Sequence, residues 1–444
     1  MPDHRFDLIV LGAGAAGMPT ALVAARKGMA VAVIDPHFSQ PNNLWISGGL
    51  FPAAGSSLQR TAGVADSPDD WLADLRAFAG DSVNQRIASA IAHALPLLAG
   101  FMVEQLDAPI RFLGDVPAPG HRATRFHSVV PASGRGLHAW LRQATAAAPA
   151  ITCFCDRAID AAERTTTGFE VRLGDDQIAA TRLMLAGGGF GASAEMVENH
   201  IPGMRGAIHN GAASNDGSVI AIARRWGAAV DGMGGYQGQG HANPGGRTRL
   251  GMSLPILGAI LVNRDGLRFV NEDVGPSALA AHVLAQPGQV ALEVFDQAIE
   301  AQLENHSAYA DAKAAGQVVA ADSVAALAAA AGVDAGALQS TLAECAGYAQ
   351  GSADPLGRAR FARVLAPPYR ASWVTGTLAH TQGGVVTDAA ARVLDPADKV
   401  IAGLYAAGGS AAGLSGAGGD GYLPGNGLAQ SFGLAWLAVH DMCG

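Results

Sequence analysis

Residues 7–35 read DLIVLGAGAAGMPTALVAARKGMAVAVID, and this stretch decides the fold. Two apolar runs, residues 8–11 and 30–34, are rich in Leu, Ile, Val and Ala and predict buried strands. Between them, residues 19–27 have the composition of a helix, and a glycine-rich turn joins this segment to the first strand. The order of strand, turn, helix and strand is a βαβ unit. It predicts a Rossmann-type α/β domain built on a parallel sheet.

The turn carries three glycines in the pattern G-x-G-x-x-G. This spacing lets the chain turn tightly, brings backbone N–H groups close to a pyrophosphate and allows the helix to pack on the strand. Asp35 ends the second strand 18 residues after Gly17, where a carboxylate accepts hydrogen bonds from the hydroxyls of an adenosine ribose. The unit therefore predicts a dinucleotide site that includes Gly12, Gly14, Ala15, Ala16, Gly17 and Asp35.

The composition is that of a large folded protein. The 444 residues are 49% hydrophobic and 15% charged, so the chain can bury a sizeable core. A net charge of −9 without a dense basic run argues against nucleic acid as a partner. Four cysteines without a C-x-x-C pair predict neither a disulfide framework nor a metal site. We expect a cytoplasmic protein without a membrane span, since neither a signal peptide nor an uninterrupted apolar run of about 18 residues is evident.

Changes of pattern along the chain predict one domain interrupted by another. We expect the dinucleotide-binding domain to comprise residues 1–232 and 358–444, and an inserted α+β capping subdomain to comprise residues 233–357. Residues 151–184 contain three short strand-like runs separated by polar turns, which predict a small β insertion in the first domain.

The start of the last helix is a second candidate ligand contact. Gly425, Asn426 and Gly427 precede an apolar helix that ends near residue 440. The first N–H groups of a helix lack intrahelical partners and lie at the positive end of its dipole. We expect this end to face a bound ligand, with an ordinary capped helix as the alternative.

The identity of the dinucleotide is indicated by motifs outside the βαβ unit. They are NNLWISGGLFPAAG at 42–55, LAGGGFG at 185–191, NDG at 215–217, GAILVNRDGLRFVNE at 258–272, TQGG at 381–384 and GLYAAG at 403–408. In this order they resemble the FAD-dependent fumarate reductase and succinate dehydrogenase flavoprotein family, over nearly the whole chain. Urocanate reductases and 3-ketosteroid dehydrogenases belong to the same family. The resemblance implies an FAD-dependent oxidoreductase that adds or removes hydrogen across an activated carbon–carbon bond.

The resemblance also assigns residues to the flavin. Covalent members of the family attach FAD through a histidine six residues before the early Gly-Gly pair, and Asn42 stands there in this chain. The resemblance therefore implies non-covalent FAD. The residues it adds to the cofactor site are Asn42, Ser47, Gly48, Gly49, Gly187, Gly188, Asp216, Gly408, Gly409, Asn426, Gly427 and Leu428.

Two departures from the family concern the substrate. Members that reduce dicarboxylates use arginines to clamp carboxylates and to deliver a proton. Pro276 or Ser277 stands at the place of the proton-donating arginine, and Tyr422 stands at the place of a clamp arginine. The loss of each fixed cation removes a charge-assisted hydrogen bond worth roughly 1.5–3 kcal/mol. We therefore do not expect fumarate or succinate to be the substrate.

Tyr422 instead resembles the 3-ketosteroid dehydrogenases, in which a tyrosine hydroxyl and a glycine N–H bind the substrate ketone. Gly427 is the candidate glycine. Such an oxyanion hole stabilises an enolate and so makes the α C–H more acidic. Tyr236 and His241 correspond to a substrate-facing segment of the family, and His380 lies beside the TQGG motif. We take all three as candidate catalytic contacts, with hydrogen-bonded structural roles as the alternative.

The leading hypothesis is dehydrogenation of a small or cyclic carbonyl compound at the bond α,β to the carbonyl. Hydride would leave for flavin N5 and the electrons would pass to an external acceptor. The first alternative is an ene-reductase of an unsaturated acid or ketone, supplied by an external donor. The second is a non-catalytic flavin-binding protein.

Overall fold

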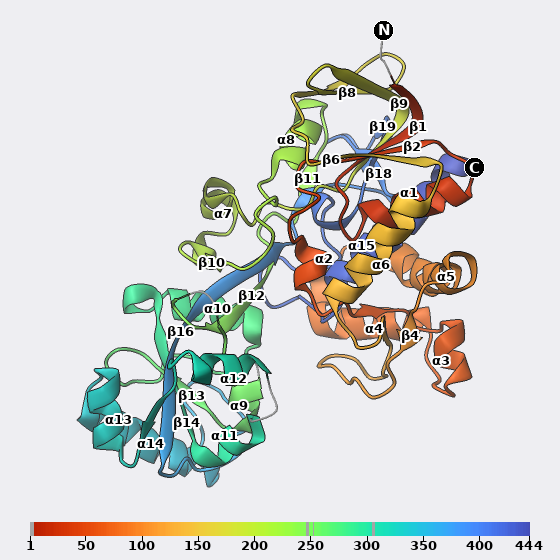
Figure 1. Cartoon of the computed structure of the whole chain (residues 1–444). Coiled ribbons are helices and arrows are strands. Elements are labelled where there is room, and N and C mark those ends of the chain that lie inside the picture. Colours follow the sequence, from red (N-terminus) through yellow and green to blue (C-terminus); the bar gives the residue numbers. More distant parts are fainter. Residues whose placement is uncertain (1–3, 246–247, 252, 304–306) are drawn as a thin grey trace. The chain divides into compact units, whose positions relative to one another are not determined.

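The computed structural model describes residues 4–245, 248–251, 253–303 and 307–444. The chain, coloured along its sequence in Figure 1, forms two compact units. The first consists of Met1–His200, Gly211–Tyr236 and His380–Gly444, and the second of Ile201–Asn210 and Gln237–Ala379. The second unit extends beyond the expected residues 233–357. The reason is that strand β16 (Tyr369–Thr381) pairs with β14 (Ala291–Asp296) and so belongs to the sheet of that unit as far as residue 379.

The main sheet of the first unit has eight strands within the described residues. They are β1 (His4–Leu11), β2 (Val31–Asp35), β6 (Ile151–Cys155), β7 (Ala161–Arg164), β8 (Phe169–Leu173), β9 (Asp176–Leu185), β18 (Arg392–Leu394) and β19 (Val400–Ala406). β1 lies between β2 and β9 and is parallel to both. Its second half, from Leu8 to Leu11, is buried, as expected for a central parallel strand that is covered on both faces.

The predicted βαβ unit is confirmed. α1 (Gly17–Arg26) connects β1 to β2, and the two strands pair in register, with Leu8 opposite Val31 and Leu11 opposite Ile34. Every residue of α1 from Gly17 to Ala24 is buried.

The predicted β insertion is wrong for most of its length. β6 pairs in parallel with β2, and β9 pairs in parallel with β1, so both strands belong to the main sheet. Helix α6 (Gly134–Ala147) leads into β6 and completes a second crossover onto this sheet. Only the hairpin β7–β8 extends beyond it, as an antiparallel continuation of β9.

Long helices pack around the sheet of the first unit. They are α4 (Pro68–Ala79), α5 (Ala88–Leu106) and α15 (Asn426–Cys443), and α15 contacts both α1 and α5. Against the expectation from the sequence, α5 is long and apolar enough to cross a membrane by length and composition alone, with a mean hydropathy of 1.3. Its contacts with α15 and α4 are those of a core helix.

The second unit is built on one mixed sheet around β16, the long strand labelled in Figure 1. Neighbouring residues of β13 belong to different hydrophobic cores: Ile260 packs in one and Leu261 in the other. This alternation shows that both faces of the sheet are covered. The further elements are β10 (Ile208–His209), β12 (Tyr236–Ala242), β13 (Ile260–Val262), β15 (Val319–Ala321), α9 (Ser253–Leu257), α10 (Pro276–Leu284), α11 (Gln297–Leu303), α12 (Ser307–Ala314), α13 (Val324–Ala331) and α14 (Ala335–Ala349).

Short elements complete the first unit. β3, β5 and β4 form one small sheet, and β11 pairs with β17. Their bounds and those of the short helices are β3 (Phe51–Pro52), β4 (Arg111–Phe112), β5 (Phe126–Ser128), β11 (Val230–Asp231), β17 (Gly384–Val385), α2 (Asn43–Ile46), α3 (Ser57–Thr61), α7 (Ala194–His200) and α8 (Ser218–Arg225).

Candidate functional site

The glycine turn between β1 and α1 has no room for a side chain at two of its three glycines. Gly12 has a φ of +106°, and a Cβ there would lie 2.4 Å from the carbonyl oxygen of Ala186. A Cβ on Gly17 would lie 1.8 Å from the carbonyl oxygen of Gly12. A Cβ on Gly14, in contrast, would meet no other group of the described residues within 4 Å. Two glycines therefore serve the packing of the chain, and the third leaves space for a ligand.

The start of α1 is open to a ligand as well. Ala15 and Ala16 lead into the helix, and no side chain among the described residues caps its first turn. N–H groups at such a helix start are donors for an anion, and the helix dipole favours negative charge there.

Asp35 and Asn42 both hold the glycine turn. The Asp35 carboxylate accepts hydrogen bonds from the backbone N–H of Ala13 at 2.7 Å and of His37 at 2.8 Å. The Asn42 amide donates to the carbonyl oxygen of Ala13 at 3.3 Å. A carboxylate oxygen has more than one lone pair, so Asp35 keeps acceptor capacity for a ribose hydroxyl.

The segment after Asn42 is fixed against α6. Asn42 caps α2 by accepting from the N–H of Trp45 at 3.1 Å, and the Ser47 hydroxyl accepts from the N–H of Gly49 at 3.0 Å. A Cβ on Gly49 would lie 2.6 Å from the backbone of Ser133, so only glycine fits there. Gly48 beside it is exposed.

A second group of predicted cofactor residues follows β9. A Cβ on Gly188 would lie 2.0 Å from the Asn215 amide oxygen, and one on Gly187 would lie 2.4 Å from Val219. Asp216 is exposed, and its carboxylate accepts from the first N–H of α8 at 2.9 Å. The structure thus gives Asp216 a capping role.

Gly408 and Gly409 bring the end of β19 against both glycine segments. A Cβ on Gly408, whose φ is +63°, would lie 3.2 Å from the Ala16 side chain. A Cβ on Gly409 would lie 2.8 Å from the backbone nitrogen of Gly189. The predicted glycines therefore converge at one edge of the main sheet.

The start of α15 leaves a buried polar atom without a partner. Gly425, with a φ of +90°, precedes the helix and, as a glycine, supplies no side-chain cap. Asn426 is fully buried and donates to the Ser415 hydroxyl at 2.6 Å, but its Oδ1 has no hydrogen-bond partner in the part of the chain that the structure describes. Buried amide oxygens are normally satisfied, so this one indicates a ligand. Leu428, in the same turn, is half-buried.

Three predicted catalytic residues meet at the same turn. The N–H of Gly427 donates to the Tyr422 hydroxyl at 3.3 Å. The rings of Tyr422 and His380 are in edge-to-face contact, with centroids 5.2 Å apart. A Cβ on Gly427 would lie 3.2 Å from His380 Nε2 and 3.3 Å from the Tyr422 hydroxyl, so both side chains pack closely against this glycine.

Burial keeps both rings uncharged at neutral pH. It raises the pKa of Tyr422 to about 12, although the bond from Gly427 opposes this shift. It lowers the pKa of His380, opposed by a contact with the carbonyl of Thr381. Tyr422 is therefore a neutral hydroxyl donor at pH 7, and His380 is a neutral imidazole.

Two glutamines support this turn and were not predicted. The Gln382 amide lies 3.1 Å from His380 Nδ1. The Gln430 amide accepts from the N–H of Leu414 at 3.1 Å and donates to the carbonyl of Gly408 at 2.8 Å. The available signal for Gln430 was a polar residue in the mostly apolar helix α15, where its side chain is buried.

Tyr236 does not join this group by a hydrogen bond. It is 6% exposed, its backbone N–H donates to Gly418 at 3.2 Å, and burial raises its pKa to about 12. Within the described residues no hydrogen bond connects it to Tyr422 or His380.

His241 belongs to the second unit and has a partner there that sequence reasoning missed. Its Nδ1 lies 3.0 Å from the Glu293 carboxylate, and both side chains are buried. Glu293 Oε1 finds no hydrogen-bond partner among the described residues. The available signal was a carboxylate within the apolar strand β14.

The features of the first unit fit a bound flavin dinucleotide. The start of α1 supplies N–H donors and Gly14 leaves space beside it. At the start of α15, the Asn426 amide oxygen lacks a partner among the described residues. An extended ligand with a pyrophosphate and a polar ring uses such a set of groups.

Comparisons with known proteins agree with this geometry. The model of the family described as FAD binding domain matches residues 7–428. The fumarate reductase (cytochrome) of Shewanella frigidimarina is 28% identical over 439 residues, which cover 94% of this chain and 74% of the relative. The 4-oxocyclohexanecarboxylate 2-dehydrogenase of Sinomonas cyclohexanicum is 26% identical, over 96% of this chain and 93% of the relative. A solved structure, the open conformation of a flavocytochrome c3 fumarate reductase, has a TM-score of 0.84 and 26% identity over 100% of this chain and 78% of its own.

These matches confirm the expected family, the FAD-binding fold and an enzymatic role, and they leave no support for a non-catalytic protein. The chain belongs to the FAD binding domain family and is an FAD-dependent oxidoreductase that acts on CH–CH bonds.

Proposed function

We propose that this enzyme dehydrogenates a small or cyclic carbonyl compound at the bond α,β to its carbonyl group. The observation that carries the proposal is the pairing of the Tyr422 hydroxyl with the Gly427 N–H, 3.3 Å apart, at the positive end of α15. A neutral hydroxyl and a helix-start N–H are the donors that a ketone oxygen needs as its negative charge grows.

The residues divide the work as follows. Bound FAD would accept the hydride that leaves the β carbon. Tyr422 and Gly427 donate hydrogen bonds to the carbonyl oxygen and so stabilise the enolate that forms when the α proton leaves. His380 is our candidate for accepting a proton near this site, because it is neutral at pH 7 and its Nε2 faces Gly427. The carbonyl of Thr381 lies 3.3 Å from Nδ1 and accepts a hydrogen bond from it, which leaves Nε2 unprotonated and able to accept a proton.

The charge of the site supports a ketone over a dicarboxylate. Tyr422 occupies the place where the resemblance implies a clamp arginine, and its neutral hydroxyl offers no charge to a carboxylate. A relative named for a cyclic oxo acid, the 4-oxocyclohexanecarboxylate 2-dehydrogenase, covers nearly the whole chain and supports a ring ketone as substrate.

An ene-reductase is the second candidate, because a relative with 28% identity is named a fumarate reductase. The same donors would then polarise the carbonyl of an unsaturated ketone or acid, and His380 would return a proton to the α carbon. We further propose that FAD is held without a covalent bond, since Asn42 caps α2 at the position where the resemblance implies the attachment histidine.

Tyr422→Phe tests the proposal. The variant removes one donor and keeps the ring, so kcat/KM for a cyclic ketone should fall by about 100-fold while the flavin content stays unchanged. Tyr348→Phe, a half-buried tyrosine in α14 whose hydroxyl has no hydrogen bond among the described residues, is the matched control. If Tyr422→Phe keeps the activity of the control, Tyr422 does not bind the carbonyl oxygen.

A further inference from the structure

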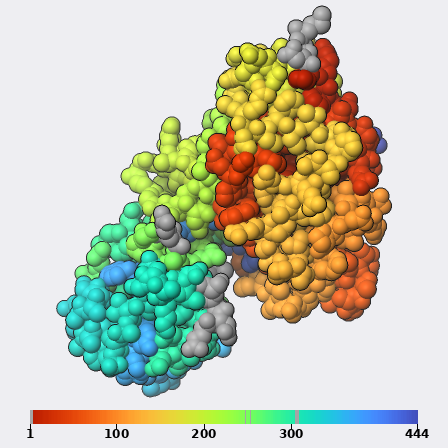
Figure 2. Space-filling view, in the orientation of Figure 1, coloured from red at the N-terminus to blue at the C-terminus, as the bar shows by residue number. Residues whose placement is uncertain are grey.

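A cavity in the first unit lies between α6 and residues 39–45, and it is lined by none of the residues assigned to the flavin. Its volume is about 450 Å³, within the range of small-molecule sites. Figure 2 shows the red N-terminal segment and the yellow segment that contains α6 side by side on one face of this unit, and α2 and α6 are in contact there. The lining residues are Ser39, Gln40, Pro41, Trp45, Arg135, His138, Ala139 and Arg142.

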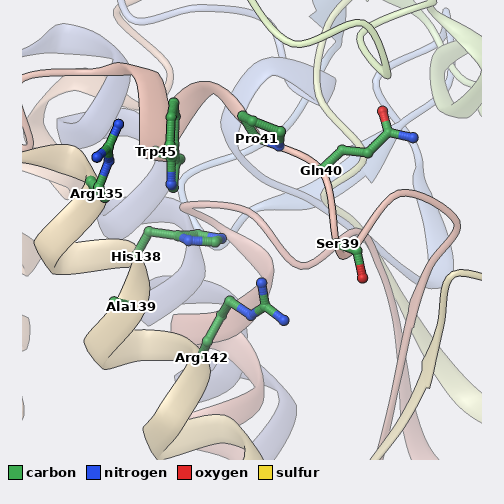
Figure 3. Close-up of a pocket in the computed structure, with 8 residues that line it drawn as sticks. All are labelled: Ser39, Gln40, Pro41, Trp45, Arg135, His138, Ala139 and Arg142. Carbon is green, nitrogen blue, oxygen red and sulfur yellow. The ribbon is translucent and has the colours of Figure 1, made fainter.

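Two arginines line the cavity. Arg135 and Arg142 extend from the same side of α6 in Figure 3, and neither makes an ion pair within the described residues. The Arg135 guanidinium lies 4.3 Å from the ring centre of Trp45, and that of Arg142 lies 4.0 Å from the ring centre of Phe38. Stacking on an aromatic ring fixes a guanidinium in place and leaves its N–H groups available at the edge.

A buried imidazole lies between these cations. His138 is 4% exposed, and its Nε2 has no hydrogen-bond partner in the described ranges. Figure 3 shows its ring directed from α6 into the cavity, between Trp45 and Arg142. A buried nitrogen without a hydrogen-bond partner is costly unless a ligand supplies one, because buried polar groups are normally satisfied.

The carboxylate near the cavity is already engaged. Asp156 accepts from the backbone N–H of Ser39 at 2.9 Å and also from its hydroxyl. These bonds hold the pKa of Asp156 below its usual value and fix residue 39 at the cavity wall. The charge of Arg142 adds to this lowering, so Asp156 fixes the wall and also offsets part of the Arg142 charge.

We propose that this cavity binds a phosphate-bearing small molecule, at a site separate from the flavin dinucleotide. Arginine pairs bind phosphate through several parallel N–H donors, and the Gln40 amide adds a neutral donor. The cavity is larger than a phosphate ion requires, so a phosphate ester of a small organic molecule is the expected ligand and free phosphate is the alternative source of the same chemistry.

The His138 imidazole gives a second readout. Burial and the nearby Arg142 lower its pKa to about 4. A phosphate dianion bound beside the ring would favour the protonated form, so binding should raise this pKa.

The test is calorimetric titration of the FAD-loaded protein with inorganic phosphate and with adenosine monophosphate, each against chloride at matched ionic strength. We expect saturable binding that weakens at least about tenfold in Arg135→Gln and in Arg142→Gln, because each loses a charge-assisted contact. Arg76→Gln, at an exposed position of α4, removes the same charge elsewhere and should bind like the parent protein. NMR of His138 should show its pKa rise upon titration.

Comparing the two anions and the three variants distinguishes the possible outcomes. Tighter binding of the monophosphate than of phosphate identifies an ester as the ligand, and equal binding identifies free phosphate. Equal loss in the Arg76→Gln control, or no saturable binding of either anion, overturns the proposal. Loss of bound flavin from the Arg135 and Arg142 variants, measured by visible absorbance, also overturns it, because the two arginines would then serve the dinucleotide.

Discussion

The imidazole of His241 lies 3.0 Å from the carboxylate of Glu293, and the two form a buried polar pair within the second unit. The strand that carries Glu293 is otherwise apolar apart from the Asp296 that ends it. Placing a carboxylate in such a strand is costly unless a partner compensates for the lost hydration. Glu293 therefore holds the His241 ring in one orientation. Among the described residues, His241 is the only side chain that hydrogen-bonds to Glu293.

Removal of this carboxylate should destabilise the protein. We expect Glu293→Ala to lower the free energy of unfolding by about 3 kcal/mol, because it leaves the buried imidazole without a partner. Glu344→Ala, at an exposed position of α14, should change it by less than about 0.5 kcal/mol. Urea unfolding of the two variants measures both values. Equal stability would mean that the pair contributes nothing to the fold.

His127 should make the folded protein less stable as the pH is lowered. This residue is fully buried between the Ser56 hydroxyl at 2.8 Å and the Arg125 carbonyl at 3.0 Å, and burial lowers its pKa to about 4. The unfolded chain takes up a proton near pH 6.5, and the folded chain takes it up only near pH 4. Its contribution to stability is therefore present above pH 6.5 and is lost as the pH falls toward 4. His127→Gln should flatten the pH dependence of Tm in this window relative to the parent protein, and parallel curves would contradict the assignment.

Two glycines of the first turn should separate folding from cofactor binding. Gly17→Ala places a Cβ on the carbonyl of Gly12 and should destabilise the apoprotein. The Cβ of Gly14→Ala meets no other group in the described part of the chain, so the apoprotein should keep its Tm while the flavin bound per chain falls. Gly100→Ala, within α5, is the control and should retain both. A Gly14→Ala protein with full flavin content would show that the pyrophosphate does not approach this glycine.

Denaturation tests whether FAD is bound without a covalent link to the protein. Acid precipitation should release all of the yellow flavin into the supernatant, because Asn42 is a helix cap and offers no nucleophile. Flavin that remains with the precipitate would contradict non-covalent binding.

The βαβ unit was predictable because a single local sequence pattern specifies it. The run from Leu8 to Leu11 and the glycine spacing after it specify β1, α1 and β2, because apolar periodicity and the turn requirement agree. The strands β6 and β9 were misassigned to an insertion. Their short runs resemble those of a hairpin, and only pairing with β2 and β1, which are distant in sequence, distinguishes the two cases.

The site was predictable to the extent that glycine and helix-start signals mark it. Tyr422, Gly427 and His380 were each named from a motif, and the structure brings the three together. Gln382 was not predicted, because a supporting side chain makes no pattern of its own. Nor was Glu293, since the partner of a buried histidine is set by strand pairing that only the folded chain provides.

The central claim, carbonyl-directed dehydrogenation, is tested most directly by the visible spectrum of the FAD-loaded protein during anaerobic titration with saturated cyclic ketones. We predict that a ketone bleaches the flavin band and yields the α,β-unsaturated ketone, and that Tyr422→Phe slows the bleaching while Tyr348→Phe does not. A flavin band that no saturated ketone bleaches, in a protein whose chemically reduced flavin is reoxidised by unsaturated acids, would contradict the claim and establish the reductive direction.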